Sequence, residues 1–278
     1  MDRPHWSYSQ LSQFLRCPLQ YFFERIAKLP KPFLPSSMVL GSAVHQSLAE
    51  YHRRLQSQQS VSRDHVQEKF MTAWMKSEGE KKIQYRDGDS RNKMLEQGVA
   101  LLNLYQDQAP PQQIVGVEQS MMVPLQNSRG EFLERPLVAV IDLLYREEAG
   151  LVVNEFKTSG RRFADSEADN ALQASAYVHA IQQKYDETAR VRYTILVKTK
   201  TPAVQNLDTV RNEKDLGRLG DIAEIIERAI EAKVFYPVES PLNCSGCPFF
   251  RPCREWRGTT KPEPDQGNLK LIAPGKPC

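Results

Sequence analysis

The sequence predicts an α/β core preceded by an N-terminal helical lobe. Three observations predict it. Apolar residues recur at helical spacing up to about residue 110, and from Gln113 the pattern changes to strands. Three strands are then followed by a helix and a further strand, which is the order of an α/β core. The 278 residues are enough to bury a full core without disulfides.

Composition and charge are those of an ordinary globular protein. Charged residues make up 26% and hydrophobic residues 40%, which excludes a wholly disordered or fibrous chain. The net charge of +3 is too small to indicate nucleic-acid binding by itself. No apolar stretch is long enough for a membrane span, and the N-terminus lacks the apolar core of a signal peptide. We therefore expect a cytoplasmic protein with no membrane partner.

Four helices are expected in the first half of the chain. The first helix begins at about Ser9, and the other three span residues 41–56, 61–82 and 91–108. Pro18 must kink or restart the first helix, and a Pro-rich connection over residues 30–37 follows it. The second helix is entered through Gly41-Ser42. Pro110-Pro111 ends the helical lobe, which we place at about residues 41–110.

The second half alternates strands and helices. By β-propensity and turn chemistry, strands are expected over 114–125, 136–146, 151–158, 190–200 and 201–210, with helices over 167–184 and 213–233. The αβββαβ core then spans about 112–235, within a single domain of residues 1–257. The remaining residues, 258–278, are rich in proline and poor in apolar side chains, which predicts a flexible tail.

Three charged residues interrupt strands where apolar residues are expected. Glu155 and Lys157 are two residues apart, so both side chains leave the same face of their strand. A four-residue turn should place this strand beside the previous one and bring Asp142 near Glu155. Two close carboxylates repel unless a cation neutralises them, which is typical of a Mg²⁺ or Mn²⁺ site, and Lys157 could orient a water nucleophile. The alternative is a structural Glu155–Lys157 ion pair on a half-exposed strand.

Four further residues are candidates for the same site. His45 ends a G-x3-H motif on a helix, although a lone helical histidine is more often structural. Gln173 and Tyr177 are spaced i, i+4 and share one helical face, where a surface pair is the alternative. Glu118 lies inside the preceding strand and is either a third acidic group of the site or a solvent-facing residue.

The ordered set G-x3-H, E, D, E-x-K and Q-x3-Y resembles the RecB-type branch of the PD-(D/E)XK nucleases. This branch includes the nuclease domains of RecB and AddB and the CRISPR-associated RecB-like exonucleases. The resemblance covers residues 8–257, nearly the whole chain outside the tail. It implies a restriction-endonuclease-like core, which is a mixed sheet flanked by helices, and an active site with no visible departure from the family pattern.

The resemblance also implies a role for each matching residue. His45, Asp142, Glu155 and the backbone carbonyl of Phe156 would bind the catalytic Mg²⁺ or Mn²⁺, and Lys157 would position the attacking water. Two further roles are implied for the remaining matches: Gln173 and Tyr177 would contact the substrate strand and support the site, and Glu118 would occupy a less uniform upstream acidic position.

Four of the five cysteines could form a second metal centre. Cys244, Cys247 and Cys253 form a C-x2-C-x5-C motif, and Cys17 lies near the opposite end of the chain. Four thiolates can hold a [4Fe–4S] cluster or a structural zinc ion, and unligated thiols are a third option. Zinc sites usually have two close pairs of ligands, so this spacing favours iron–sulfur. The same arrangement in AddB-like and CRISPR-associated RecB-like nucleases implies an iron–sulfur staple joining residue 17 to residues 244–253, whereas Cys278 is expected to be uninvolved.

Two groups of basic residues indicate a DNA partner. One group lies on a single strand region, and the other is interleaved with aromatic residues that could stack on bases, as could Tyr177. A solvated strand and a hydrophobic knot beside the cysteines are the alternatives. The two groups are Arg190, Arg192, Lys198 and Lys200, and Arg251, Arg254 and Arg257 with Phe249, Phe250 and Trp256.

These observations predict a metal-dependent deoxyribonuclease, an exonuclease on single-stranded DNA or DNA ends that serves repair, recombination or defence. No Walker phosphate-binding loop is present in the sequence, so a helicase motor or a CRISPR integrase would be a separate polypeptide. Three alternatives remain open. They are a CRISPR adaptation nuclease that trims spacer precursors, a catalytically idle iron–sulfur DNA-binding module, and an electron-transfer protein.

Overall fold

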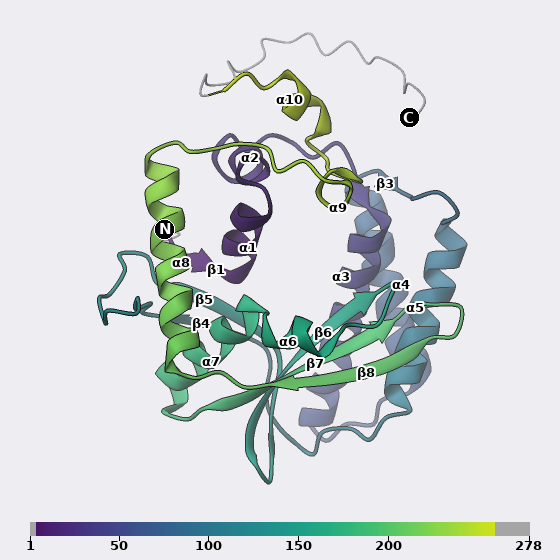
Figure 1. The fold of residues 1–278 in the computed structure, drawn as a ribbon. Helices are drawn as coiled ribbons and strands as arrows, with labels where there is room; N and C mark the ends of the chain where they lie inside the picture. The colour runs from purple at the N-terminus through teal and green to yellow at the C-terminus, as the bar shows by residue number, and fades with distance from the viewer. Residues whose placement is uncertain (1–3, 259–278) are drawn as a thin grey trace.

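The computed structural model describes residues 4–258, so Cys278 and the expected tail beyond residue 258 lie outside the described residues. A mixed sheet forms the centre of the molecule, with strand order β1-β5-β6-β7-β8 and with β4 paired to β5 (Figure 1). Its strands are β1 (Trp6–Ser7), β4 (Gln113–Val123), β5 (Leu137–Glu147), β6 (Gly150–Ser159), β7 (Ala189–Val197) and β8 (Ala203–Thr209). The predicted mixed sheet is therefore confirmed.

The pairing directions follow from the connections. β4, β5 and β6 form an antiparallel meander, in which residues 124–136 connect β4 to β5 and a tight turn connects β5 to β6. The crossover through α6 (Asp165–Asp169) and α7 (Leu172–Tyr185) makes β6 and β7 parallel, and β8 returns antiparallel to β7. The two-residue strand β1, which is too short to give a sequence pattern, pairs in parallel with the first residues of β5.

The N-terminal helices follow the prediction with one correction. As expected, the first helix is interrupted and restarts at Pro18. α1 (Tyr8–Arg16) ends before it, and α2 (Pro18–Tyr21) and the π-helical turn η1 (Phe22–Ile26) follow. The prediction that the next helix is entered at Gly41 is wrong, because α3 (Ser36–Gln56) begins directly after Pro35. Gly41 has a packing role instead, since a Cβ there would lie 3.3 Å from Oγ1 of Thr158.

The remaining elements lie close to their expected positions. The expected helix over 167–184 is divided into α6 and α7, and a short pair of strands lies beside the helical lobe. These elements are α4 (Arg63–Glu80), α5 (Arg91–Gln106), α8 (Glu213–Glu231), α9 (Pro241–Cys244), α10 (Phe250–Glu255), β2 (Leu34–Pro35) and β3 (Ile83–Gln84). Among the helices of residues 4–258, none has the length and apolar character needed to span a bilayer.

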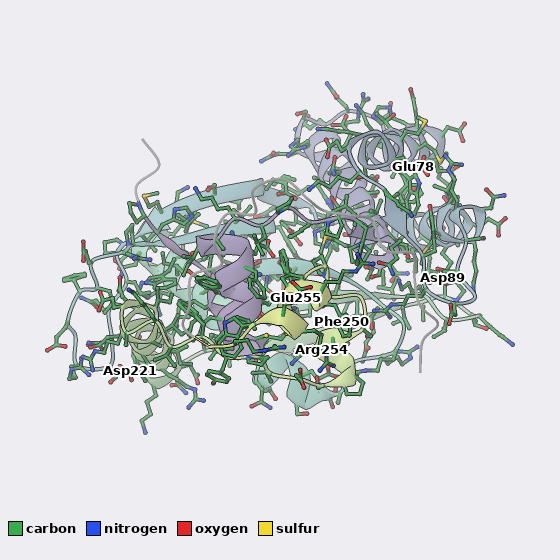
Figure 2. The ribbon with its side chains drawn as sticks, turned by 90° about the horizontal axis from the view of Figure 1, so that it is seen from above. Glu78, Asp89, Asp221, Phe250, Arg254 and Glu255 are labelled. Carbon is green, nitrogen blue, oxygen red and sulfur yellow. The ribbon has the colours of Figure 1, made fainter. Side chains whose placement is uncertain are left out.

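The helices form layers on both faces of the sheet, each with its own hydrophobic core. Helices α1, α7 and α8 cover one face, and the helical lobe of α3, α4 and α5 covers the other. Figure 2 shows this from above, with Glu78 of α4 at one end of the molecule and Asp221 of α8 at the other. Because each core uses one face of the same strands, the sheet fixes the two layers relative to each other.

The two faces exchange side chains near the middle of β5. Ile141 packs in the core beside α7 and α8, whereas Leu143 packs in the core of the helical lobe. Residues two apart on a strand ordinarily share a face. Glu118, opposite Asp142 on β4, has a φ of 50°, which is unfavourable for a residue other than glycine. This irregularity interrupts the alternation and places Asp142 where the faces exchange.

Candidate active site

The site forms where β5 and β6 stop pairing. Their ladder runs from the tight turn to the pair Leu143 and Asn154, and no further pair is formed beyond it. The backbone N–H of Phe156, one step past the expected next pair, donates to Oδ2 of Asp142 at 2.9 Å. A side-chain carboxylate thus replaces the missing ladder partner. The strands separate at this point, and charged residues occupy the opening.

One group of side chains lies on the helical-lobe side of the opening. His45 of α3, Glu118 of β4 and Asp142 of β5 form a His–Glu–Asp triad whose potential ligand atoms all lie within 4.8 Å of one another. Nδ1 of His45 is 3.3 Å from Oδ2 of Asp142. Glu118, for which a site residue and a solvent-facing residue were both expected as alternatives, lies beside His45 and Asp142.

The charges of the triad depend on one another. Burial alone would lower the pKa of His45, but the hydrogen bond and charge of Asp142 outweigh it and raise that pKa. Burial opposes ionisation of Asp142, and the His45 contact outweighs it and lowers the pKa of Asp142. Burial and the neighbouring Asp142 charge raise the pKa of Glu118. Burial opposes the ionisation of both carboxylates, and a neighbouring cation would favour it.

A second group lies on the α7 side and is centred on Glu155, which is 4% exposed. Oε1 of Glu155 accepts hydrogen bonds from Nζ of Lys157 at 2.6 Å and from Nε2 of Gln173 at 2.9 Å. The hydroxyl of Tyr177 donates to its other oxygen, Oε2. Lys157 also donates to Oε1 of Gln173 at 2.9 Å. Every hydrogen-bonding atom of this group therefore has a fixed neighbour.

Burial and charge oppose each other in the second group. Burial raises the pKa of Glu155 despite the attraction of Lys157. Burial alone would lower the pKa of Lys157, but the charge of Glu155 outweighs it and raises that pKa. Burial and the nearby carboxylates raise the pKa of Tyr177 well above its usual value, so its hydroxyl stays a hydrogen-bond donor. An added cation would favour the ionised form of Glu155.

The structure therefore brings together all seven side chains singled out in the sequence, but in two groups. Glu155 lies outside the triad, because its oxygens are held by Lys157, Gln173 and Tyr177. The expectation that Tyr177 stacks on bases is wrong, since its ring is 4% exposed and packs in the core. The buried Gln173 and Tyr177 instead orient Glu155 and Lys157.

A hollow of about 770 Å³ opens from the triad towards the helical lobe, and we call it the α4 hollow. Besides the triad, three basic residues line it: Arg53 of α3 and Lys69 and Lys76 of α4. These residues were not recognised in the sequence. The one available signal is that Lys69 and Lys76, seven residues apart, lie on the same face of a helix.

The four cysteines of the predicted second centre lie near one another at the meeting of the two chain ends. Cys17, Cys247 and Cys253 pack against a small core of Leu19, Phe23 and Phe249. Burial, and then the neighbouring thiols, raise the pKa values of Cys247 and Cys253. Among the described residues, these thiols do not gather within 4.8 Å as the triad does.

The basic groups expected to contact DNA are largely engaged within the protein. On β7, Arg190 and Arg192 pair with Glu147 of β5 and Asp208 of β8, so neighbouring strands supply the acids that the local sequence lacks. Phe249, which was expected to stack on bases, is buried. Phe250 remains half exposed beside Arg254 on α10, with 5.1 Å between the guanidinium and the ring (Figure 2).

Comparisons with known proteins agree with this geometry. The chain resembles the crystal structure of a "Putative exonuclease" from Eubacterium rectale, at 12% identity and a TM-score of 0.55, over 93% of this chain and 90% of that one. The structure of SSO0001, at 12% identity over 87% and 92% of the two chains, has a TM-score of only 0.35. The comparison with curated proteins found no match. The model of the PD-(D/E)XK nuclease superfamily matches residues 5–254, and the chain therefore belongs to this superfamily.

Proposed function

We propose that the protein is a metal-dependent deoxyribonuclease of the RecB type that acts as an exonuclease on single-stranded DNA or DNA ends. Members of the superfamily are nucleases and use divalent metal ions, so phosphodiester hydrolysis is the expected reaction class. The observation that carries the proposal is the triad of His45, Glu118 and Asp142 beside the network of Glu155 and Lys157.

The residues present fit a divalent metal ion. Carboxylate and carbonyl oxygens are the ligands that Mg²⁺ and Mn²⁺ prefer, and an imidazole nitrogen can complete the set around a transition metal such as Mn²⁺. The two carboxylates of the triad are partly buried and have no Lys or Arg as a close ion partner in the described part of the chain. His45, Asp142, Glu155 and the carbonyl of Phe156 would hold the ion, and Glu118 lies close enough to contribute.

The protein residues would divide the remaining work. When bound, the ion would supply Lewis-acid stabilisation and an activated water. The ammonium of Lys157 would orient that water and stabilise negative charge developing on the phosphate. Tyr177 and Gln173 would fix the carboxylate of Glu155 through their hydrogen bonds, and Oε2, which accepts only from Tyr177, would be the oxygen offered to the ion.

Cleavage assays on two variants test this assignment. Asp142→Ala and Lys157→Ala should each reduce cleavage of a labelled single-stranded oligonucleotide about a thousandfold or more, with the fold retained by circular dichroism. Asp87→Ala and Lys82→Ala, which remove exposed charges outside the site, are the matched controls and should cleave normally. Near wild-type cleavage by both site variants, in Mg²⁺ and in Mn²⁺, would contradict the proposal.

The requirement for a free end is tested with a second substrate. A covalently closed single-stranded circle of the same composition as the linear strand should resist cleavage if the enzyme is an exonuclease. Cleavage of the circle and the linear strand at equal rates would show an endonuclease. The pathway served, and any separate helicase or CRISPR integrase, remain predictions from the sequence.

We also propose that Cys17, Cys244, Cys247 and Cys253 hold a [4Fe–4S] cluster. A tetrahedral zinc ion with bonds of about 2.3 Å would need its sulfur ligands about 4 Å apart. In the described residues, no three of these thiols lie within 4.8 Å of one another. A larger cluster fits a wider set. Protein purified without oxygen should be brown, Cys17→Ala should lose the colour, and Cys278→Ala should keep it. A colourless protein with one equivalent of zinc would overturn the cluster.

A further inference from the structure

The α4 hollow contains more than the triad, and its remaining lining carries a second chemical function. One face of α3 contributes His45, Ala49 and Arg53, and one face of α4 contributes Lys69 and Lys76. The lysines are about 10 Å apart along α4, since seven residues rise about 1.5 Å each. Arg53 lies two helical turns beyond His45. The basic residues thus extend away from the triad along two packed helices.

These three cations are available to bind a ligand. Arg53, Lys69 and Lys76 are exposed, and none forms an ion pair with another residue of the described chain. Glu50, which also lines the hollow, already accepts hydrogen bonds from Arg54 and His65. Glu118 lies near enough to Arg53 for their charges to interact, but not within ion-pair distance. The wall of the hollow beside the triad is therefore positively charged.

The shape and composition of the wall suit a phosphate backbone. Alanine, glycine, serine and threonine occupy most of the remaining positions, so a chain of phosphates and sugars could approach the helices closely. No phenylalanine, tyrosine or tryptophan lines the hollow. Binding here would use charge and would not use base stacking.

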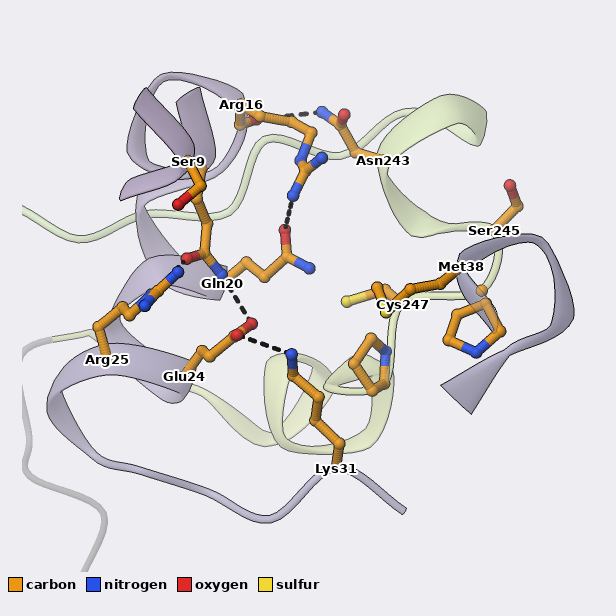
Figure 3. A pocket seen from close by; sticks show the side chains of 14 residues that line it. Ser9, Arg16, Gln20, Glu24, Arg25, Lys31, Met38, Asn243, Ser245 and Cys247 are labelled. Atoms are coloured by element: carbon orange, nitrogen blue, oxygen red, sulfur yellow. Dashed lines mark hydrogen bonds and ion pairs between the residues drawn. The ribbon is translucent and has the colours of Figure 1, made fainter. Parts of the chain in front are cut away.

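A second hollow, of about 300 Å³, lies across Met38, which lines both. It also contains basic residues, but most are engaged (Figure 3). Lys31 donates to Glu24 at 2.6 Å, and Arg25 donates to Gln13 at 3.0 Å. Its charge is therefore partly neutralised, and the α4 hollow offers the stronger phosphate site.

We propose that Arg53, Lys69 and Lys76 bind the phosphates of the DNA strand next to the scissile phosphate, so that the strand lies along α3 and α4. This inference rests on the proposed function and assigns the substrate path of the same site. The carboxylates of the triad repel a polyanion, and the three cations offset this repulsion one or two nucleotides from the cleavage position. The helical lobe thereby becomes one wall of the substrate site.

The test measures DNA binding without cleavage. The full-length protein, purified without oxygen and kept in EDTA, is titrated with a fluorescent 20-nucleotide single strand at several salt concentrations. The double variant Lys69→Ala/Lys76→Ala should bind about tenfold more weakly, and the slope of log affinity against log salt should fall by about 1.4, since each single-strand phosphate contributes about 0.7. Lys69→Arg/Lys76→Arg should restore binding.

Two controls separate this path from general charge and from stacking. Lys81→Ala/Lys82→Ala removes the same charge from the same lobe, just after α4 and outside both hollows, and should bind as wild type does. A strand made of abasic nucleotides should show the same loss in the Lys69/Lys76 variant as a strand with bases, because the wall has no aromatic residue.

Unchanged affinity and salt slope in the Lys69→Ala/Lys76→Ala variant would overturn the path, whether or not the wild type cleaves DNA. Equal losses in the Lys81→Ala/Lys82→Ala control would also overturn it, because the effect would then be one of net charge. A wild type that binds the strand but never cleaves it would instead contradict the proposed function. The binding measurement would still decide the path in that case.

Discussion

The candidate active site and the cysteine region differ in how their side chains are held. In the active site, the sheet register and a network of hydrogen bonds fix Glu155, Lys157 and Asp142. The cysteines sit on or beside α2, α9 and α10, which are only four, four and six residues long. Helices this short are not stable by themselves. The fold alone organises the candidate active site, whereas we expect the cysteine region to depend on what its thiols bind.

The largest expected effect is on the stability of the cysteine region. A cluster joining Cys17 to the C-terminal cysteines closes a loop of more than 200 residues, worth about 5 kcal/mol in unfolded-chain entropy. Cys17→Ala should therefore lower the melting temperature strongly, as measured by circular dichroism. The isosteric variant Asp142→Asn should change it little. Equal melting temperatures for Cys17→Ala and wild type would mean that the cysteine region is stable without a bound cluster.

The next effect tests the packing of α3 against the strand that carries Glu155 and Lys157. His52 of α3 stacks on Phe156 and is fully buried, and burial lowers its pKa to about 4 from the usual 6.5. The neutral ring is favoured in the folded state, so its stabilisation is complete above about pH 6.5 and is lost as the pH falls towards 4. The loss should reach about 3 kcal/mol in urea unfolding. His52→Gln should flatten the pH dependence between these values.

A smaller effect sharpens the description of the active site. Tyr177→Phe removes the hydroxyl that orients Glu155 and should reduce kcat about tenfold, with little change in KM and a stability loss of about 1 kcal/mol. The matched control is Tyr185→Phe on the same helix, whose hydroxyl bonds Gln119 away from the site. A purely structural Tyr177 would lower stability in both variants and leave kcat unchanged.

The smallest effect concerns the β7 arginines. Arg190 and Arg192 are neutralised by Glu147 and Asp208, so Arg190→Gln should not change DNA affinity or its salt dependence. Fluorescence titration beside the Lys69→Ala/Lys76→Ala variant checks this. A loss as large as that of the lysine variant would place the DNA on β7.

Features that depend on residues close together in the sequence were predicted, and features that depend on residues far apart were not. The period of two along a strand is local, so it correctly placed Glu155 and Lys157 on one face. The position of Glu118 depends on its positive φ, which cannot be predicted from the residue type. The acids that pair with Arg190 and Arg192 come from two other strands, so adjacency in the sequence misled the charge analysis.

The same limit applies to the aromatic residues and the helix boundaries. The local sequence does not show that Tyr177 and Phe249 are buried, because their burial results from packing against other elements. Tyr177 packs in the core beneath α7, and Phe249 packs against Phe23. α3 begins at Ser36 and not at Gly41. A glycine pattern alone does not distinguish a helix entry from close packing, and Gly41 packs closely on Thr158. Patterns within one element were predictable, and contacts between elements were not.

Metal binding to the triad tests the central claim most directly. Calorimetric titration of Mn²⁺ into the wild-type protein, into Asp142→Asn and into the control Asp87→Asn reports the site without requiring cleavage. A preorganised site predicts one binding event in the wild type and the control, lost in Asp142→Asn while circular dichroism stays unchanged. Binding of equal strength in Asp142→Asn would contradict the proposal that Asp142, together with His45 and Glu155, holds the catalytic metal.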